Sequence, residues 1–198
     1  MSVLPIYVYG TKILKKRSQN VTETNESLHK LIFDMFETMR KANGIGLAAN
    51  QVGDSRRIIT IDISDADEPN AEGEAESNEH PTSPDLPRTL VVINPEIIAT
   101  EGSWIMEEGC LSIPDIHAEV ERPEKIKVRF LDAELHEQEL VADGLLARVL
   151  QHEMDHLEGV LFIERISRAK RSMLMPKLRK IRKGEIDLSY NIVTMMDE

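Results

Sequence analysis

Two histidines four residues apart constrain the fold of this chain more than any other feature of its sequence. The run His152-Glu153-Met154-Asp155-His156 matches the pattern H-E-x-x-H, in which both imidazoles lie on one face of a helix, about one turn apart. At this separation the two rings can bind one metal ion, and the glutamate between them can act as a general base. A histidine pair that only makes hydrogen bonds in the core is the alternative.

The neighbouring residues predict the helix that this pattern requires. Asp143 can cap its start and Gly159 can end it. Apolar side chains recur at helical spacing before the histidines: Leu145, Leu146, Val149 and Leu150. Because the histidines continue this apolar stripe, we expect them to point into the protein.

Size and composition favour a globular protein with one domain over 1–198. The chain has 198 residues, of which 41% are hydrophobic and 30% are charged. No apolar run approaches the roughly 18 residues that a membrane span needs. The short apolar opening, 3–9, contains Pro5 and is not preceded by a basic residue, so it does not resemble a signal peptide. We therefore expect a cytoplasmic protein without a membrane partner.

Charge is distributed unevenly along the chain. Residues 65–85 contain eight acids and no lysine or arginine, and so account for eight of the eleven net negative charges. Such a segment lacks the apolar residues needed to offset the entropy of ordering, which predicts a flexible acidic insertion over 65–87. It connects two predicted strands, 57–62 and 89–93. An acidic binding arm is the less favoured interpretation.

The opposite bias marks 165–183, which holds nine lysines and arginines and no acid. Ile166, Ala169 and Met173 recur at helical spacing, and Pro176 then interrupts or kinks the pattern. The segment predicts a basic helix. Such a helix can present a solvated face or follow a phosphate backbone, and the sequence does not separate the two.

The remaining periodicities complete an α+β fold. Residues 26–43 predict an amphipathic helix, capped by Thr24 or Asn25 and ended by Gly44. Alternating residues predict three further strands, at 118–120, 125–131 and 138–141. We expect antiparallel strands packed around a central metal-binding H-E-x-x-H helix, with an N-terminal amphipathic helix and a C-terminal basic helix.

Two further segments can carry chemistry. Cys110 is the only cysteine, which excludes an internal disulfide and leaves an inert thiol, a reactive thiol or a metal ligand. The histidine pair favours the ligand. Segment 44–53 is rich in glycine and alanine, so its backbone can approach a ligand closely, and Gln51 adds an amide donor. A tight turn between helix and strand is the alternative for this segment.

Taken together, three motifs resemble those of the peptide deformylases in the same order. They are G-I-G-L-A-A-N-Q at 44–51, E-G-C-L-S at 108–112 and Q-H-E-M-D-H at 151–156. The resemblance extends to Leu4-Pro5-Ile6 and covers nearly the whole chain apart from the acidic insertion. This family removes the N-formyl group from the initiator methionine of new polypeptides. The resemblance therefore implies a hydrolase of a linear amide bond that acts on N-formyl-methionyl nascent peptides and releases formate.

The resemblance also implies a metal and its ligands. Cys110, His152 and His156 correspond to the ligands of the family, which leave a fourth position open as catalytic sites do. Members of the family commonly work with Fe²⁺, so we expect one Fe²⁺ per chain, for which Zn²⁺, Ni²⁺ or Co²⁺ can substitute.

Catalytic roles follow from the same correspondence. A metal-bound hydroxide would attack the formyl carbon, with Glu153 as general acid and base. The side-chain amide of Gln51 and the backbone N–H of Leu111 would stabilise the oxyanion.

Substrate contacts are implied in the same way. Ile45, Gly46, Leu47 and Gly109 would align the peptide as an added strand. Leu145 and Val149, with the edge of the His152 ring, would form a slot for the methionine side chain, although ordinary core packing also explains the two apolar residues.

Three features depart from the family pattern. The acidic insertion is long, Arg148 stands on the catalytic helix where an apolar residue is common, and His117 stands where arginine is often found. Arg148 and His117 can alter the preference for residues after methionine. Because a deformylase acts on chains leaving the ribosome, ribosomal RNA is a candidate partner of 165–183. No DNA partner is expected.

Two other functions fit parts of the sequence. A zinc endopeptidase shares the H-E-x-x-H pattern but usually takes a later histidine or glutamate as third ligand, and no histidine follows His156. A non-catalytic, metal-stabilised binding module would use the basic helix. Structural zinc sites normally close with a fourth protein ligand, which a single cysteine makes harder.

Overall fold

The computed structural model describes residues 2–66 and 82–197. Its helices are α1 (Glu26–Lys41), α2 (Gly144–Leu157) and α3 (Arg168–Lys183), and short 3-10 helices lie at Ile13–Lys15, Ala49–Val52 and Phe162–Glu164. The strands are β1 (Ile6–Tyr7), β2 (Gly46–Ala48), β3 (Ile58–Asp62), β4 (Thr89–Glu101), β5 (Trp104–Cys110), β6 (Ile113–Arg122), β7 (Lys125–Leu131), β8 (Glu137–Ala142) and β9 (Ile192–Val193).

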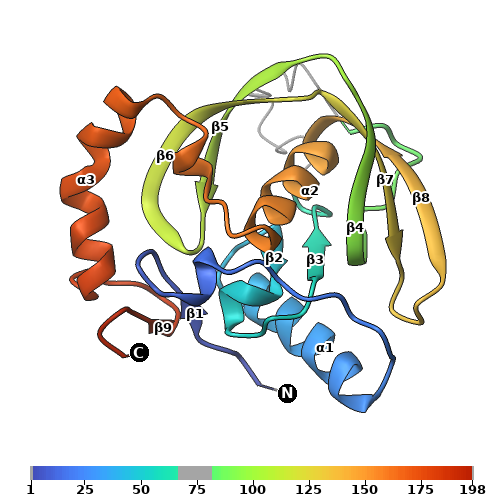
Figure 1. Ribbon diagram of the computed structural model, residues 1–198, viewed down its shortest axis with the longest axis horizontal. Coiled ribbons are helices and arrows are strands. Elements are labelled where there is room, and N and C mark those ends of the chain that lie inside the picture. The colour runs from blue at the N-terminus through green and yellow to red at the C-terminus, as the bar shows by residue number, and fades with distance from the viewer. Residues whose placement is uncertain (1, 67–81, 198) are drawn as a thin grey trace.

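The strands form three sheets. Five of them make an antiparallel sheet in the order β2-β3-β4-β7-β8, and β5 pairs with β6 in an antiparallel hairpin. The two short strands near the ends of the chain, β1 and β9, pair in parallel. Figure 1 shows α2 near the middle, with β5 and β6 to one side of it and β4, β7 and β8 to the other. The expected mixture of helices and antiparallel strands is confirmed, and the parallel pair was not anticipated.

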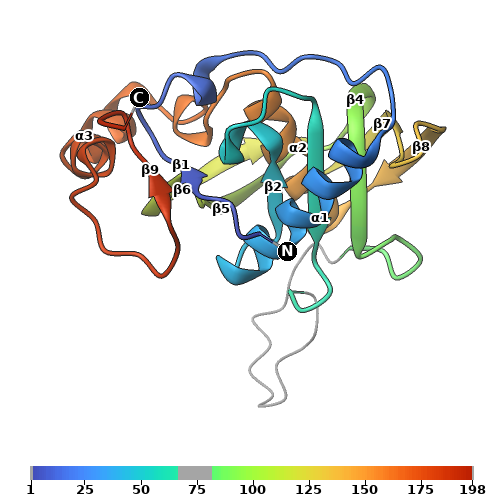
Figure 2. The same cartoon turned by 90° about the horizontal axis from the view of Figure 1, so that it is seen from below.

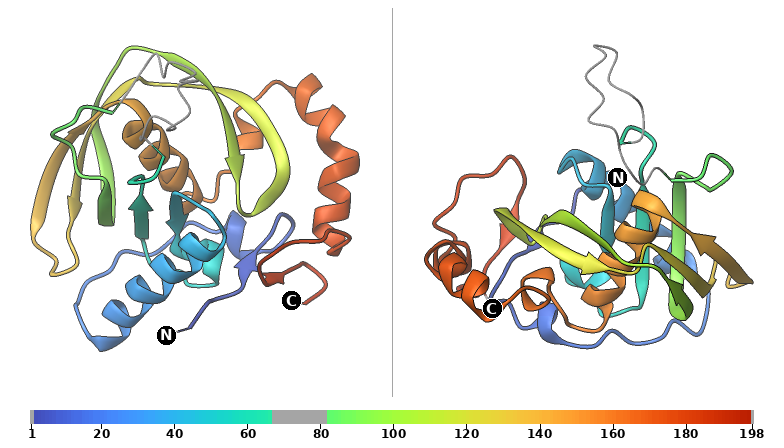
Figure 3. Two further views of the ribbon diagram at one scale, coloured as in Figure 1. Left: turned by 180° about the vertical axis from the view of Figure 1, so that it is seen from behind. Right: turned by 90° about the horizontal axis from the view of Figure 1, so that it is seen from above.

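Alternation along β3 explains why helices cover both faces of the larger sheet. Ile59 and Ile61 belong to the apolar cluster that contains the α2 side chains, whereas Ile58 belongs to the cluster that contains those of α1. Successive side chains of a strand point to opposite faces, so one strand supplies both cores. The views in Figure 3 show α1 and α2 on either side of the strands.

Helix α2 is buried around almost its whole circumference. Of its residues only Met154 is more than slightly exposed. Asp143 is the N-cap residue, as expected, but its carboxylate does not cap the helix and instead accepts hydrogen bonds from the N–H and hydroxyl of Ser83. Thr82 supplies a cap in its place, since its hydroxyl accepts the N–H of Leu146. The end of the long β3–β4 connection therefore fixes the start of α2.

The ends of the other helices differ from their predicted positions. Helix α1 has Asn25 as its cap and ends at Lys41, two residues before the predicted end. Helix α3 starts at Arg168 rather than at 165, because the hydroxyl of Ser167 accepts the N–H of Lys170 and begins the helix there. Pro176 lies within α3 without ending it.

Most of the predicted acidic insertion, 67–81 of 65–87, lies outside the described residues. Within the part that the structure describes, no helix is long and apolar enough to cross a membrane.

Candidate active site

Three potential metal ligands converge from two elements. Cys110 ends β5, and His152 and His156 lie one turn apart on α2. One donor atom from each residue lies within 4.8 Å of the other two, and Cys110 Sγ is 3.2 Å from His156 Nε2. The two histidines are almost fully buried and the cysteine is partly exposed. The structure thus brings together Cys110 and the two histidines of the H-E-x-x-H pattern.

The hydrogen bonding of His152 is typical of a metal ligand. Its Nδ1 lies 2.9 Å from Oε2 of Glu108. A carboxylate only accepts hydrogen bonds, so Nδ1 carries a proton and Nε2 is the ring atom that can coordinate an ion, which is the arrangement that metal-binding histidines adopt. One thiolate and two imidazoles suit Zn²⁺ and other divalent transition metals.

Glu108 is the centre of a buried charge network. Its carboxylate accepts hydrogen bonds from Arg122 at 2.6 and 2.9 Å and from Arg148 at 3.0 Å, besides His152. All three charged residues of this group, Glu108, Arg122 and Arg148, are at most 5% exposed. Burial alone would raise the pKa of Glu108, but the hydrogen bonds from Arg122 and His152 outweigh it and hold the pKa well below its usual value. Glu108 is therefore an anion that orients His152.

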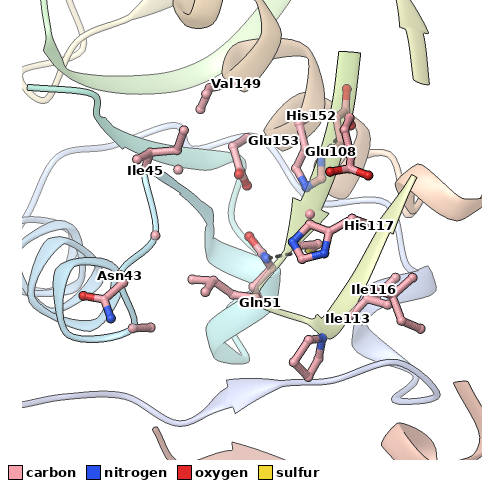
Figure 4. Close-up of a pocket in the computed structure, with 18 of the residues that line it drawn as sticks. Asn43, Ile45, Gln51, Glu108, Ile113, Ile116, His117, Val149, His152 and Glu153 are labelled. Atoms are coloured by element: carbon pink, nitrogen blue, oxygen red, sulfur yellow. Dashed lines mark hydrogen bonds and ion pairs between the residues drawn. The ribbon is translucent and has the colours of Figure 1, made fainter. Parts of the chain in front are cut away.

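The carboxylate of Glu153 lies at the same site, and one of its oxygens has no hydrogen-bond partner among the described residues. Its Oε2 is buried and makes no hydrogen bond in the part of the chain described. Gly46 makes room for it, because a Cβ atom at Gly46 would lie 2.6 Å from Oε1 of Glu153 and from Val149. Burial raises the pKa of Glu153 to about 7. Figure 4 shows Glu153, His152 and Gln51 directed toward one space.

Gln51 is held in one orientation beside Cys110. Its side-chain oxygen accepts the N–H of Ala48 at 2.8 Å, and its nitrogen donates to the hydroxyl of Ser112 at 3.2 Å and contacts Cys110 Sγ at 3.7 Å. The side chain is 1% exposed. Its N–H groups are therefore presented to the metal-ligand cluster, as an oxyanion donor would be.

These groups border a cavity of about 420 Å³. The predicted substrate residues that line it are Ile45, Gly46, Gly109, Leu145 and Val149, and the predicted oxyanion donor Leu111 lines it too. Leu47 does not line it, since its side chain is fully buried in the apolar cluster that packs under α1, and its contact with a peptide stays a prediction. Its position in β2 explains this, because Leu47 points to the face opposite Gly46 and Ala48.

Two of the departures from the family pattern lie at the cavity, together with two residues that the sequence did not suggest. Arg148 and His117 line it, and the ring of His117 lies over Gly109, where a Cβ atom would be 2.8 Å away. Leu188 and Tyr190 line it too, from the segment after α3. Burial, together with the charges of Cys110 and Asp115, raises the pKa of Tyr190 to about 12. No motif marks these last two residues, and only the fold brings them to the site.

Comparison with known proteins finds peptide deformylases. The family model for polypeptide deformylase matches residues 3–172. The peptide deformylase of Salinibacter ruber is 47% identical over 197 residues, covering 99% of this chain and 97% of its own. That of Mesorhizobium japonicum is 43% identical, covering 93% of this chain and 96% of its own.

Solved structures of peptide deformylases resemble this chain as well. The peptide deformylase of Legionella pneumophila superposes with a TM-score of 0.76 at 38% identity, over 93% of this chain and 98% of its own. A plant peptide deformylase superposes with a TM-score of 0.79 at 31% identity, over 93% of this chain and 92% of its own.

Proposed function

Because the chain belongs to the polypeptide deformylase family and is therefore a hydrolase, we propose that it cleaves the N-formyl group from formyl-methionine at the start of nascent polypeptides and releases formate. One observation carries the proposal: Cys110, His152 and His156 converge at a cavity that Glu153 and Gln51 also border. Membership of this family argues against the two alternative functions, a zinc endopeptidase and a non-catalytic binding module. We also propose that 1–198 acts as one catalytic domain in the cytoplasm, where nascent chains appear.

The residues of this site divide the chemistry among them. A divalent ion held by the thiolate and the two imidazoles would supply a Lewis acid that polarises the formyl group and lowers the pKa of a water molecule. Glu153 would take a proton from that water on Oε2, which has no hydrogen-bond partner among the described residues, and deliver it to the departing amine. A pKa of about 7 suits a group that both accepts and donates a proton near neutral pH.

Stabilisation of the developing negative charge falls to two N–H donors. The Gln51 amide is fixed by its bonds to Ala48 and Ser112 and so needs no reorganisation during the reaction. The backbone N–H of Leu111, next to Cys110, would be the second donor. A single donor of this kind typically contributes about 10²–10³ in rate.

Two open strand edges define how a peptide would lie. Strand β2 is at the edge of the five-stranded sheet, and β5 pairs only with β6 among the described residues. Gly46 of the first and Gly109 of the second both line the cavity, so a substrate would be bound as an added strand between them. The methionine side chain would occupy the slot bordered by Leu145 and Val149.

Metal identity gives the first prediction. We propose Fe²⁺ as the working ion, and expect protein reconstituted with Fe²⁺ under anaerobic conditions to release formate from a formyl-Met peptide faster than protein loaded only with Zn²⁺. Formate release and metal content are measured on the same samples. Equal rates for the two metals would contradict the iron assignment. Absence of formate from every metal-loaded form would contradict the proposed function itself.

A ribosomal partner is proposed for the basic helix α3. Lys177, Arg179 and Lys180 are exposed on it. Contacts of such residues with phosphates release counterions, so binding falls steeply as salt increases. We expect the triple variant Lys177→Glu, Arg179→Glu, Lys180→Glu to bind ribosomes more weakly and to lessen the slope of log K against log salt by about 1 for each phosphate that the helix no longer neutralises. Cosedimentation over a salt series measures both.

The matched control places the same charge changes elsewhere on the surface. Lys16, Lys41 and Lys125 are exposed outside α3, and their replacement by glutamate should leave the interaction less affected. Equal weakening by both triple variants would contradict a specific role of α3, because it would show a dependence on net charge alone.

A further inference from the structure

The chain continues past α3 and returns to the cavity. The family model ends at 172, whereas α3 extends to Lys183 and is followed by residues 185–197, here called the C-terminal segment. Gly184 has a φ of +72°, which reverses the chain at the end of the helix. Figure 2 shows the C-terminal segment leaving α3 and reaching β9, beside β1. This part of the protein therefore lies beyond the part that matches the family model.

Backbone hydrogen bonds attach the C-terminal segment to the neighbourhood of Cys110. The N–H of Val8, just after β1, donates to Val193 in β9 at 3.0 Å. The next residue, Tyr9, donates to the carbonyl of Ser112 at 2.8 Å. One run of the chain thus bonds to β9 on one side and to the residues that follow the metal ligand on the other.

A closed turn completes the segment. Thr194 is 7% exposed, and its N–H and hydroxyl donate to the carboxylate of Asp197 at 2.7 and 2.8 Å. Ile186 and Ile192 pack against the apolar cluster that also contacts Cys110. The C-terminal segment is consequently part of the folded body around the site.

The closest link to the active site is a hydrogen bond from the hydroxyl of Tyr190 to the carbonyl oxygen of Leu111, at 2.9 Å. We propose that the C-terminal segment forms part of the substrate site, and that Tyr190 is a positioning residue that holds Leu111 in place. The inference rests on the proposed function, in which the N–H of Leu111 is an oxyanion donor. Leu188 and Tyr190 line the same cavity, so the segment also forms one of its walls.

Leu111 carries both the carbonyl that Tyr190 holds and the N–H that would face the oxyanion. Leu111 follows Cys110 directly, where β5 has ended and β6 has not begun, so strand pairing does not restrain its carbonyl. The hydroxyl of Tyr190 fixes that carbonyl and thereby limits rotation of the residue that carries the N–H donor. Oxyanion donors act through preorganisation, and catalytic groups must be held within about 0.5 Å of their productive position.

The test compares two Tyr→Phe variants of the metal-loaded protein. Tyr190→Phe keeps the ring and removes only the hydroxyl, and we expect kcat for a formyl-Met peptide to fall about five- to tenfold, the effect of losing one neutral hydrogen bond, with KM within about twofold. Tyr7→Phe is the control, since Tyr7 packs on Gly53 outside the cavity. Its kinetic constants should equal those of the wild type.

Hydrogen exchange supplies a readout that does not depend on activity. In zinc-loaded Tyr190→Phe, the amides of 109–113 should exchange faster than in the wild type, and those of α1 should not change. An unchanged kcat, or a rise in KM alone, would overturn the positioning role. Unchanged exchange at 109–113 would overturn it as well. If the wild type released no formate while exchange at 109–113 still increased, the proposed function would fail and the structural link between Tyr190 and Leu111 would stand.

Discussion

In the Glu153→Gln variant, kcat should fall by a factor of about 10²–10⁴, which is the contribution of a general acid–base residue. The variant should keep its metal. The carboxylate is buried, one of its oxygens has no protein partner in the described structure, and burial raises its pKa to about 7. Glutamine has nearly the same size and cannot exchange a proton at that position. The donors of the metal cluster remain Cys110, His152 and His156. Chemistry should therefore stop without loss of the fold or the ion.

Formate release and metal content are the two measurements for this variant. Glu158→Gln is a matched control, because Glu158 follows the last residue of the same helix, is exposed and does not line the cavity. Its kcat should stay close to that of the wild type. A Glu153→Gln protein with a tenth or more of the wild-type kcat would contradict the acid–base role. Loss of the metal from this variant would show instead that Glu153 is a ligand.

Local patterns were enough to predict the elements that carry most of the site. The spacing of His152 and His156 places both on one face of a helix whatever the rest of the chain does, and α2 has them there. The apolar repeat that predicted α1, the run of isoleucine and threonine that predicted β3 and the alternation that predicted β7 are equally local. These patterns reflect a helix or strand with a buried face, which the five-stranded sheet and its two covering helices provide.

Strand β5 shows where such patterns fail. Judged by hydrophobicity, Ile105 would be buried and Glu108 would face solvent, but Ile105 is 61% exposed and Glu108 is 5% exposed. The reason is the buried network, in which Glu108 is neutralised by Arg122 on β6 and Arg148 on α2. An ion group assembled from three separate elements leaves no periodic trace in the sequence. The strand that carries Cys110 was therefore missed, although Cys110 itself was identified through its motif.

Contacts between the ends of the chain are unpredictable for a related reason. The pair β1–β9 consists of two residues from each strand, separated by almost the whole chain, and so has no period to detect. Tyr190 reaches Leu111 only because this pair forms and α3 is capped by Gly184.

The buried network also gives the largest expected effect on stability. Glu108→Gln removes the carboxylate that two almost fully buried arginines share, and Asp155, which accepts from Arg122 at 2.8 Å, remains the only acid bonded to either of them in the described structure. Breaking a buried charge pair by removing one partner typically destabilises a protein by about 3–5 kcal/mol, because a charge stays buried without compensation. We expect a decrease of this size in the free energy of unfolding. Loss of the negative charge that orients His152 should also weaken metal binding by about 10–100-fold.

Urea unfolding of the metal-free proteins separates these two effects, since the arginines need their partner whether or not an ion is bound. Glu119→Gln is the control: Glu119 pairs with Lys170 at 2.8 Å on the surface, and its loss should change the free energy of unfolding little. Metal affinity is then measured by competition with a chelator. If metal-free Glu108→Gln were as stable as the wild type, the arginines would not depend on Glu108. If only the metal affinity fell, orientation of His152 would be the sole role of this carboxylate.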